Sequence, residues 1–321
     1  MTAPQFSDYA EYGRRRDEEQ PAAWHATPLV TIVTVTLNSA ATVERTIASV
    51  QNQTLKAIEH VFVDGASTDG TYPLVRRAMR AKDHAISEKD RGISDAFNKG
   101  VAMARGRYVQ ILNSDDWLSP DQIESATRAL RTTNADFVFG DLIFYEAGRP
   151  SFAYVGDPAY ALSIHRRMPA ISHPTVLVAR TWFEQIGMFD LSYRTAMDYD
   201  LLLRLHRAGG RGVYCPDVLG HMTHDGVSNR QFRRTIEEVR RITIAHGRPA
   251  TLATAEARLR YLKTLAAQPI RRRARPLYSS IRRAINPSFR RVPPHLPQAP
   301  AAQPRDLGSP DPNSGAPAGR P

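Results

Sequence analysis

Residues 87–117 read SEKDRGISDAFNKGVAMARGRYVQILNSDDW, a stretch that combines a loop, a helix, a strand and an acidic turn. Apolar residues recur at helical spacing between positions 93 and 104, which predicts a helix with one face against a core. Gly106 ends this helix, and RYVQIL predicts a strand that stops at the turn. Asp115 and Asp116 stand side by side at the carboxyl end of the strand, where two carboxylates repel each other. A divalent cation is the obvious partner for such a pair.

Segments before this stretch extend the same pattern. The β-branched run LVTIVTVTL at 29–37 predicts a strand buried on both faces, and HVFVDG at 60–65 predicts a second one. Apolar residues at helical spacing separate the two strands at 43–50, and a third short strand is expected at 85–87. This alternation predicts an α/β fold with a mostly parallel sheet, right-handed crossovers and flanking helices.

Polar residues follow four of the expected strands. Ligands of parallel sheets bind beyond the carboxyl ends of the strands, so these four segments are expected to meet at one crevice. Three acids also have a local alternative: a simple turn for Asp64, and a turn that caps the helix near Pro120 for Asp115 and Asp116. The four residues at the strand ends are Asn38, Asp64, Asp90 and Asp115.

Four motifs resemble those of the family 2 glycosyltransferases, which have the nucleotide-sugar fold called GT-A. The motifs are VTIVTVTLN at 30–38, VDGASTDGT at 63–71, EKDRGISDAFNKGVAMARG at 88–106 and LNSDDW at 112–117. The resemblance covers roughly residues 29–228, and its third motif is similar to the branch that builds bacterial exopolysaccharides, colanic-acid type enzymes among them. It implies an inverting, metal-dependent enzyme that moves a sugar from a nucleotide-diphosphate sugar to a hydroxyl of a glycan or lipid-linked acceptor in surface polysaccharide synthesis.

The resemblance also implies a role for each residue of the nucleotide half of the site. Mg²⁺ or Mn²⁺ held by a carboxylate would neutralise the charge that develops on a leaving nucleoside diphosphate. Two departures from the family pattern concern the base contact and the outer metal ligand: Gly65 replaces a second acid, and Asn113 replaces an aspartate. The implied roles are nucleobase and ribose binding for Thr36, Asn38, Asp64 and Asp90, approach to the ribose for Asp115, and metal binding for Asp116.

The helix predicted at 197–207 carries the candidate general base. Asp198 lies on the same helical face as three leucines and is expected to point inward, where the helix dipole would hold it ionised. Asp200 is expected to point away and to pair with Arg204 at i+4. In the family that this chain resembles, the acid that begins this helix deprotonates the acceptor hydroxyl, although Met197 here replaces the usual preceding glutamate. The local alternative for Asp198 is a helix N-cap.

Three histidines are candidates for minor roles in the site. His173 resembles an acceptor-side residue of the same branch, with a core or turn position as the alternative reading. His221 and His224 compete for a contact with the metal or the diphosphate.

Composition and charge describe the rest of the chain. The 321 residues contain 42% hydrophobic residues, no apolar run near the ~18 that span a bilayer, and one cysteine, Cys215. The N-terminal stretch lacks an apolar signal region, so a cytoplasmic protein is expected. Residues 1–230 carry 25 Lys and Arg against 27 Asp and Glu, whereas residues 231–321 carry 18 against 5. The net charges of these parts are −2 and +13, so the basic excess lies in the C-terminal third.

These features predict four segments. Residues 1–27 are a mobile lead, 28–230 the GT-A domain, 231–292 a basic helical C-terminal extension broken at Pro269 and Pro276, and 293–321 a disordered Pro-rich tail. The extension has the composition of a peripheral contact with the inner face of an anionic plasma membrane, with a solvated face as the alternative and nucleic acid the least favoured.

Two other functional classes remain open from the sequence. A nucleotidyltransferase shares a nucleotide-binding parallel sheet, but TLNSAAT stands after the first strand where its glycine-rich phosphate loop is expected. A non-catalytic nucleotide-sugar binding protein would lack nucleotide-sugar hydrolysis.

Overall fold

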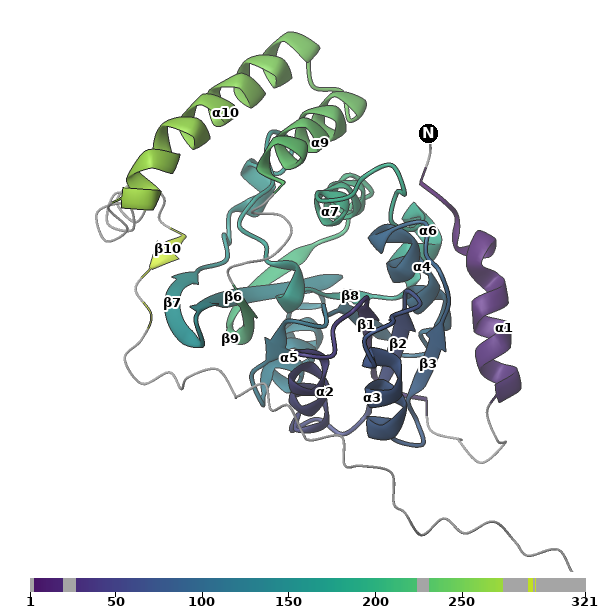
Figure 1. The fold of residues 1–321 in the computed structure, drawn as a ribbon. Coiled ribbons are helices and arrows are strands. Elements are labelled where there is room, and N and C mark those ends of the chain that lie inside the picture. The colour runs from purple at the N-terminus through teal and green to yellow at the C-terminus, as the bar shows by residue number, and fades with distance from the viewer. Residues whose placement is uncertain (1–2, 20–26, 224–230, 274–287, 291, 293–321) are drawn as a thin grey trace, which may run out of the picture.

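The computed structural model describes residues 3–19, 27–223, 231–273, 288–290 and 292, and its elements surround one sheet (Figure 1). In this part of the chain the sheet has ten strands in the order β10, β7, β6, β8, β4, β1, β2, β3, with β9 paired to β6 and β5 paired to β9. The α/β fold predicted from the sequence is therefore confirmed.

One half of the sheet is parallel, as predicted. Its register places Thr36 beside Asp64 and Asp64 beside Ser87, so the carboxyl ends of three strands are level with each other. The strands of this half are β1 (Val30–Thr36), β2 (Ile58–Asp64), β3 (His84–Ser87) and β4 (Tyr108–Ile111).

The other half of the sheet is largely antiparallel, in contrast to the mostly parallel sheet that the βαβ alternation predicts. Ala147 and Gly148, both with positive φ, turn β6 back into β7 as a hairpin. β8 then returns antiparallel between β4 and β6, whereas β9 pairs with β6 in parallel. These strands are β5 (Trp117–Leu118), β6 (Phe137–Glu146), β7 (Arg149–Tyr154), β8 (Leu177–Ala179), β9 (Gly212–Thr223) and β10 (Phe289–Arg290).

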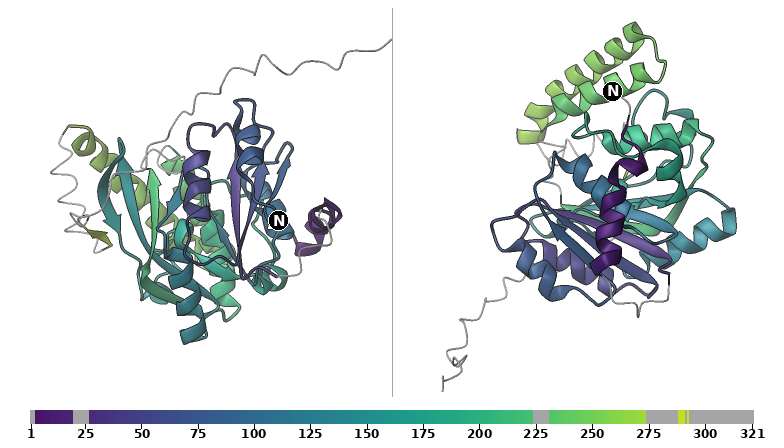
Figure 2. Two further views of the ribbon diagram at one scale, coloured as in Figure 1. Left: turned by 90° about the horizontal axis from the view of Figure 1, so that it is seen from below. Right: turned by 90° about the vertical axis from the view of Figure 1, so that its right-hand side faces the viewer.

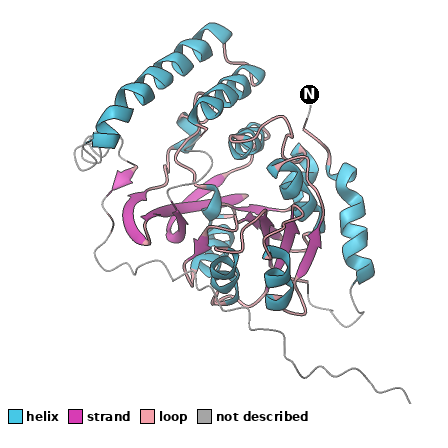
Figure 3. Cartoon of the chain, viewed as in Figure 1, coloured by secondary structure: helices cyan, strands magenta, loops and turns pink. Residues whose placement is uncertain are grey.

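Helices cover both faces of the sheet (Figures 1 and 3). Val33 and Val35 of β1 pack into the core shared with α4 and α7, whereas Val30 and Ile32 pack into the core shared with α5. β1 is thus buried on both faces, as its β-branched run predicts. On one face lie α2 (Val43–Gln51), α3 (Thr71–Ala78) and α5 (Gln122–Thr133), and on the other α4 (Ile93–Met103), α6 (Thr181–Ile186) and α7 (Met197–Arg207), with the short 3-10 helices η2 (Tyr160–Leu162) and η3 (His173–Thr175) in the connections.

A glycine sets the distance between α4 and β1. Any side chain at Gly100 would clash with Val33, so the helix lies directly on the strand. This close approach places the loop before α4 at the carboxyl end of the sheet, where the site is expected.

Residues 3–19 of the N-terminal segment are largely helical and packed against the fold, whereas the sequence predicts a mobile lead over 1–27. η1 (Phe6–Tyr9) and α1 (Ala10–Glu19) pack along α4 at the edge of the molecule (Figure 2). Tyr9 is 2% exposed, and its hydroxyl donates to the Asp95 carboxylate at 2.7 Å. The composition of this segment does not predict the contact, because the segment is mostly polar and much of the packing comes from the single side chain of Tyr9.

The C-terminal helices also differ from the prediction. α9 (Phe232–Ala245) contributes Val239 and Ile242 to the core around α7, so the predicted domain boundary at residue 230 cuts through a continuous core. α10 (Ala250–Arg273) continues through Pro269, where a break was predicted, and β10 is a strand within the supposedly helical extension. The predicted break at Pro276 and the tail at 293–321 lie outside the described residues. Among the described helices, none has the length and apolarity of a membrane-spanning segment.

Candidate active site

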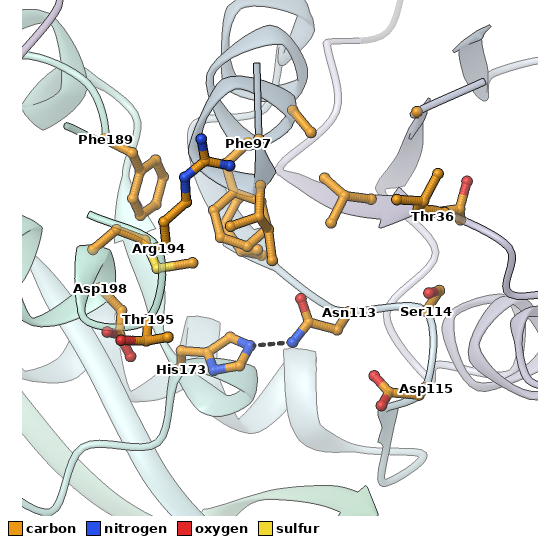
Figure 4. Close-up of a pocket in the computed structure, with 18 of the residues that line it drawn as sticks. Thr36, Phe97, Asn113, Ser114, Asp115, His173, Phe189, Arg194, Thr195 and Asp198 are labelled. Atoms are coloured by element: carbon orange, nitrogen blue, oxygen red, sulfur yellow. Dashed lines mark hydrogen bonds between the residues drawn. The ribbon is translucent and has the colours of Figure 1, made fainter. Parts of the chain in front are cut away.

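A cavity of about 940 Å³ opens at the carboxyl ends of the parallel strands. It is lined by the end of β1, the loop before α4, the turn after β4 and the start of α7. Asp198 and Asp115 lie on opposite sides of it, with a hydrogen bond between His173 and Asn113 in the middle (Figure 4). The cavity brings together six of the eight site residues predicted from the sequence, namely Thr36, Asn38, Asp90, Asp115, His173 and Asp198.

Asp64 does not line the cavity, contrary to the role implied for it. Its side chain is fully buried, and its oxygens accept hydrogen bonds from the Thr36 hydroxyl at 2.8 Å, the Ser67 amide at 2.9 Å and the Ser87 hydroxyl at 2.6 Å. Thr36 and Ser87 end β1 and β3, and Ser67 lies in the turn after β2, so Asp64 joins the ends of these three neighbouring strands. It affects the site through Thr36, which does line the cavity.

The acidic turn is arranged differently from the prediction. Asp116, expected at an open strand end, is fully buried and is not part of the cavity wall. Burial, followed by the charge of Asp115, raises the pKa of Asp116 well above its usual range. The carboxylate that faces the cavity belongs to Asp115, whose pKa burial also raises. The turn that begins at Asn113, whose carbonyl accepts the Asp116 amide at 3.2 Å, places Asp115 in the cavity wall and Asp116 in the interior.

Arg45 on α2 fixes this turn from behind. Its guanidinium donates to the backbone carbonyl of Asp115 at 2.8 Å and lies 3.9 Å from the centre of the Trp117 ring. The hydroxyl of Thr46 binds the next carbonyl, that of Asp116, at 2.7 Å. The turn is thus held through its backbone, which leaves the Asp115 carboxylate available to a ligand.

The turn fits a hard divalent cation. On the cavity wall it presents the carboxylate of Asp115 and the amide oxygen of Asn113, which is buried and has no hydrogen-bond partner among the described residues. Oxygen atoms are the donors that Mg²⁺ and Mn²⁺ prefer. In the described part of the chain no group of three His, Cys, Asp or Glu side chains gathers to hold a metal. A cation here would complete its shell with water and phosphate oxygens, as Mg²⁺ commonly does in nucleotide sites.

A buried lysine orders the loop before α4. Lys99 Nζ lies 2.7 Å from Asp90, 2.9 Å from Glu88 and 3.7 Å from Asp95, and the side chain is 3% exposed. Tyr12 of α1 donates to the same Glu88 at 2.8 Å. Asp90 therefore reaches the cavity in a fixed position, and burial raises its pKa although Lys99 opposes this.

The positions of the two acids of α7, Asp198 and Asp200, agree only in part with the prediction. Asp198 lines the cavity, and burial raises its pKa to about 6, which outweighs the expected effect of the helix dipole. Asp200 pairs with Arg204 at 2.9 Å, as predicted, but is 4% exposed and also lies 3.4 Å from His246, which follows directly after α9. Asp200 is therefore a structural residue inside the protein and not an exposed surface acid.

A carboxylate from α9 binds the segment that leads into α7. Glu238 is 3% exposed and accepts the backbone amides of Arg194 at 3.0 Å, Thr195 at 2.8 Å and Ala196 at 3.0 Å. Helix starts expose unpaired amides, and here the buried acid binds the amide of the N-cap residue Ala196 together with the two amides before it. The Arg194 side chain points into the cavity and lies so close to Gly92 that a side chain at that position would clash with it.

The histidines take distinct places. His173 lines the cavity with its Nε2 3.0 Å from the Asn113 amide, and burial lowers its pKa to about 4. His221 is buried against Trp117 with its Nε2 2.9 Å from the Ser119 hydroxyl, which makes it a core residue. His224 lies outside the described residues.

Comparison with known proteins identifies the family. The model for glycosyl transferase family 2 matches residues 31–187. A glycosyltransferase of PGL/p-HBAD biosynthesis from Mycobacterium tuberculosis is 31% identical over 184 residues, which are 56% of this chain and 70% of that protein. The chain belongs to glycosyltransferase family 2. The succinoglycan biosynthesis protein ExoO of Rhizobium meliloti, 30% identical over 230 residues and 66% of each chain, is a further relative of this family 2 protein.

A solved structure shares the fold. The mannosyltransferase PcManGT of Pyrobaculum calidifontis, solved with GDP-Man and Mn²⁺, matches with a TM-score of 0.55 at 21% identity over 88% of this chain and 84% of that one. The GT-A fold expected from the sequence is thus confirmed. The matched part of the family 2 chain spans between 20% and 70% of the length of its curated relatives.

Three residues of the site were not found from the sequence. Arg45 and Glu238 act through contacts with segments far away in the chain, and no local spacing signals such contacts. Arg194 lies in a loop between α6 and α7 whose conformation depends on Glu238.

Proposed function

We propose that this protein is a metal-dependent, inverting glycosyltransferase that moves a sugar from a nucleotide-diphosphate sugar to a hydroxyl of an acceptor. One observation carries the proposal: Asp198, a carboxylate with a raised pKa, lines the same cavity as Thr36, Asp90 and Asp115. A nucleotide-binding wall and a proton acceptor on opposite sides of one cavity are what direct displacement between two substrates requires.

The donor is assigned to the side formed by the parallel strands. Thr36, Asn38 and Asp90 are proposed to bind the nucleoside, since all three lie at strand ends on the cavity wall. Asp115, in place of the Asp116 expected earlier, is proposed as the metal ligand. Mg²⁺ or Mn²⁺ bound there would supply the positive charge that makes the nucleoside diphosphate a good leaving group.

The acceptor is assigned to the side of α7. Asp198 takes the proton of the acceptor hydroxyl while the hydroxyl oxygen forms a bond to the anomeric carbon and the bond from that carbon to the diphosphate oxygen breaks. Attack opposite the leaving group inverts the anomeric centre. Phe97 and Phe189, with ring centres 5.1 Å apart, line the cavity and exclude water from this region. His173 remains a proposed acceptor-side residue.

The relatives and the charge of the chain support a proposed acceptor and a proposed location. ExoO is described as a succinoglycan biosynthesis protein, which supports a glycan or lipid-linked acceptor in bacterial surface polysaccharide synthesis. The basic C-terminal third supports a cytoplasmic enzyme bound at the periphery of an anionic membrane. Membership of family 2 does not favour the nucleotidyltransferase alternative.

A ligand panel tests the proposal. The melting temperature of the full chain is measured with UDP, GDP and dTDP sugars, with and without Mn²⁺, because a ligand that binds the folded state raises the apparent stability. We expect at least one nucleotide sugar to raise it, and to raise it more with Mn²⁺. If no nucleotide sugar does so, or Mn²⁺ adds nothing, the proposed donor site is wrong.

A further inference from the structure

A second cavity, of about 300 Å³, lies between the 166–167 segment and α10, away from the site described above. Arginine and lysine side chains supply most of its wall, together with Leu259 and Glu256. The Glu256 carboxylate is already bonded to Arg248, with 3.0 Å to its Nε. The four cations of the wall are Arg166, Arg167, Arg260 and Lys263.

These four cations form no ion pair with any acid in the part of the chain that is described. Like charges brought together repel each other, and the acid of the wall, Glu256, is already bonded to Arg248, so an anion is favoured in the space between the four cations. Burial lowers the pKa of Arg260, and the charge of Arg167 acts in the same direction, while Tyr199 and Glu256 oppose the shift. An anion in the cavity would relieve both effects.

The outer side of α10 adds an apolar stripe to this cluster. Leu252, Leu259 and Leu262 are 51%, 52% and 61% exposed, and their spacing of seven and three residues places them on one helical face. Ala255 and Ala266 are exposed on the same face. α10 packs on α9 and lies on the outside of the molecule, away from the sheet (Figures 1 and 2). Leu259 belongs to the stripe and also to the cavity wall, so the two features meet.

We propose that the 166–167 segment and α10 form a binding site for an anionic membrane lipid, with the headgroup phosphate in the basic cavity and the leucine stripe against the apolar part of the bilayer. Arginine suits a phosphate because its planar fork donates two hydrogen bonds at once. Exposed leucines favour a lipid over a nucleic acid, which offers no apolar phase. This proposal rests on the proposed function in one respect. If the acceptor is lipid-linked, the site would hold the enzyme against the membrane that carries the acceptor.

Vesicle co-sedimentation of the full chain tests this site. The vesicles are phosphatidylcholine alone or phosphatidylcholine with one third phosphatidylglycerol, at physiological salt. Each basic residue near an anionic surface contributes about 1 kcal/mol, so the double variant Arg166→Gln, Arg167→Gln should bind the anionic vesicles about 30-fold more weakly. The variant Leu259→Ser, Leu262→Ser should also lose about tenfold or more. All four side chains are at least partly exposed, so the fold should survive these changes.

A matched control separates this site from net charge. Arg76→Gln, Arg131→Gln removes the same charge from exposed positions on α3 and α5, and it should bind like the natural protein. Equal binding to neutral and anionic vesicles, or equal losses in the Arg166 and Arg76 variants, would overturn the lipid site. Stabilisation by inorganic phosphate or by an RNA oligomer without vesicle binding would overturn it as well. Nucleotide-sugar stabilisation is measured on the same samples: its absence in the natural protein refutes the proposed function, whereas vesicle failure with donor stabilisation intact refutes only the lipid site.

Discussion

Glu238 on α9 accepts both the backbone amide of Thr195 at 2.8 Å and its hydroxyl at 2.9 Å, and so joins the C-terminal helices to the start of α7. Asp198 stands in the first turn of that helix. The base proposed for the reaction is therefore positioned by a buried acid from a segment that charge alone would assign to a separate extension. Glu238 does not line the cavity and acts through Thr195 and its neighbours.

The first prediction concerns Glu238→Gln. The negative charge of Glu238 adds to burial in raising the pKa of Asp198, so its removal should lower that pKa. The acid limb of kcat/KM, expected near pH 6, should move to lower pH, while stability falls by about 1–3 kcal/mol through weakened hydrogen bonds. The pH profile is the measurement, because a purely structural role would leave the limb in place. Glu237→Gln, which removes an exposed acid paired with Arg240 at 2.6 Å, is the control and should shift nothing.

The second prediction separates the adjacent acids of the turn. Asp115→Asn should abolish the extra stabilisation that Mn²⁺ gives to the nucleotide-bound protein, with little change in the melting temperature of the free protein, because this side chain faces the cavity. Asp116→Asn should keep a metal-dependent shift. It should also raise the stability of the free protein at neutral pH, because an ionised carboxylate in this buried position is unfavourable. Thermal melts of both variants with and without Mn²⁺ measure this. If only Asp116→Asn loses the metal effect, Asp116 and not Asp115 is the metal ligand.

The third prediction concerns Asp200→Asn. Burial opposes ionisation of Asp200, but His246 and Arg204 lower its pKa on balance, so its charge stabilises the fold at neutral pH. The variant should lose about 1–3 kcal/mol of unfolding free energy at pH 7. Because the folded pKa is depressed, the difference should shrink as the pH falls below about 4, where the unfolded chain takes up the proton. Urea unfolding at both pH values measures this, and a loss that is equal at both would show that the charge is not its source.

The fourth prediction is a stability gain in Asp198→Asn. The folded pKa of Asp198, about 6, is above the ordinary value, so its ionisation destabilises the native state at neutral pH. Asparagine should therefore raise the unfolding free energy at pH 7.5 by on the order of 1 kcal/mol, a gain that disappears below about pH 4. Asp217→Asn, at a position with a 67% exposed side chain, is the control for the substitution itself. An equal gain in both variants would mean that the ionisation of Asp198 does not destabilise the native state.

The sequence predicted the elements whose signals are local. The helix at 197–207 was placed with its observed bounds, and the strand ends that form the crevice were found from the βαβ alternation. Periodicity could not decide whether Asp115 or Asp116 faces the cavity, because that depends on how Arg45 and Thr46 hold the turn backbone. It also assigned Asp200 to the surface, since α9, which covers it, follows later in the chain.

Contacts between distant segments account for the other differences. Tyr9 and Glu238 lie in segments that composition marks as polar or basic, yet each buries one side chain against the central helices α4 and α7. A single buried residue leaves no periodic signal, so such a contact becomes visible only in the folded chain.

The most direct test of the account compares turnover with donor binding in Asp198→Asn, with the nucleotide sugar selected by the ligand panel. Asparagine keeps the size of the side chain but cannot accept the acceptor proton. We expect kcat to fall by ~10² to 10⁴ while donor affinity, measured by calorimetry, stays within about twofold of that of the natural protein. A variant that retains turnover, or that loses donor affinity in proportion to turnover, would contradict the claim that Asp198 is the base on the acceptor side of this cavity.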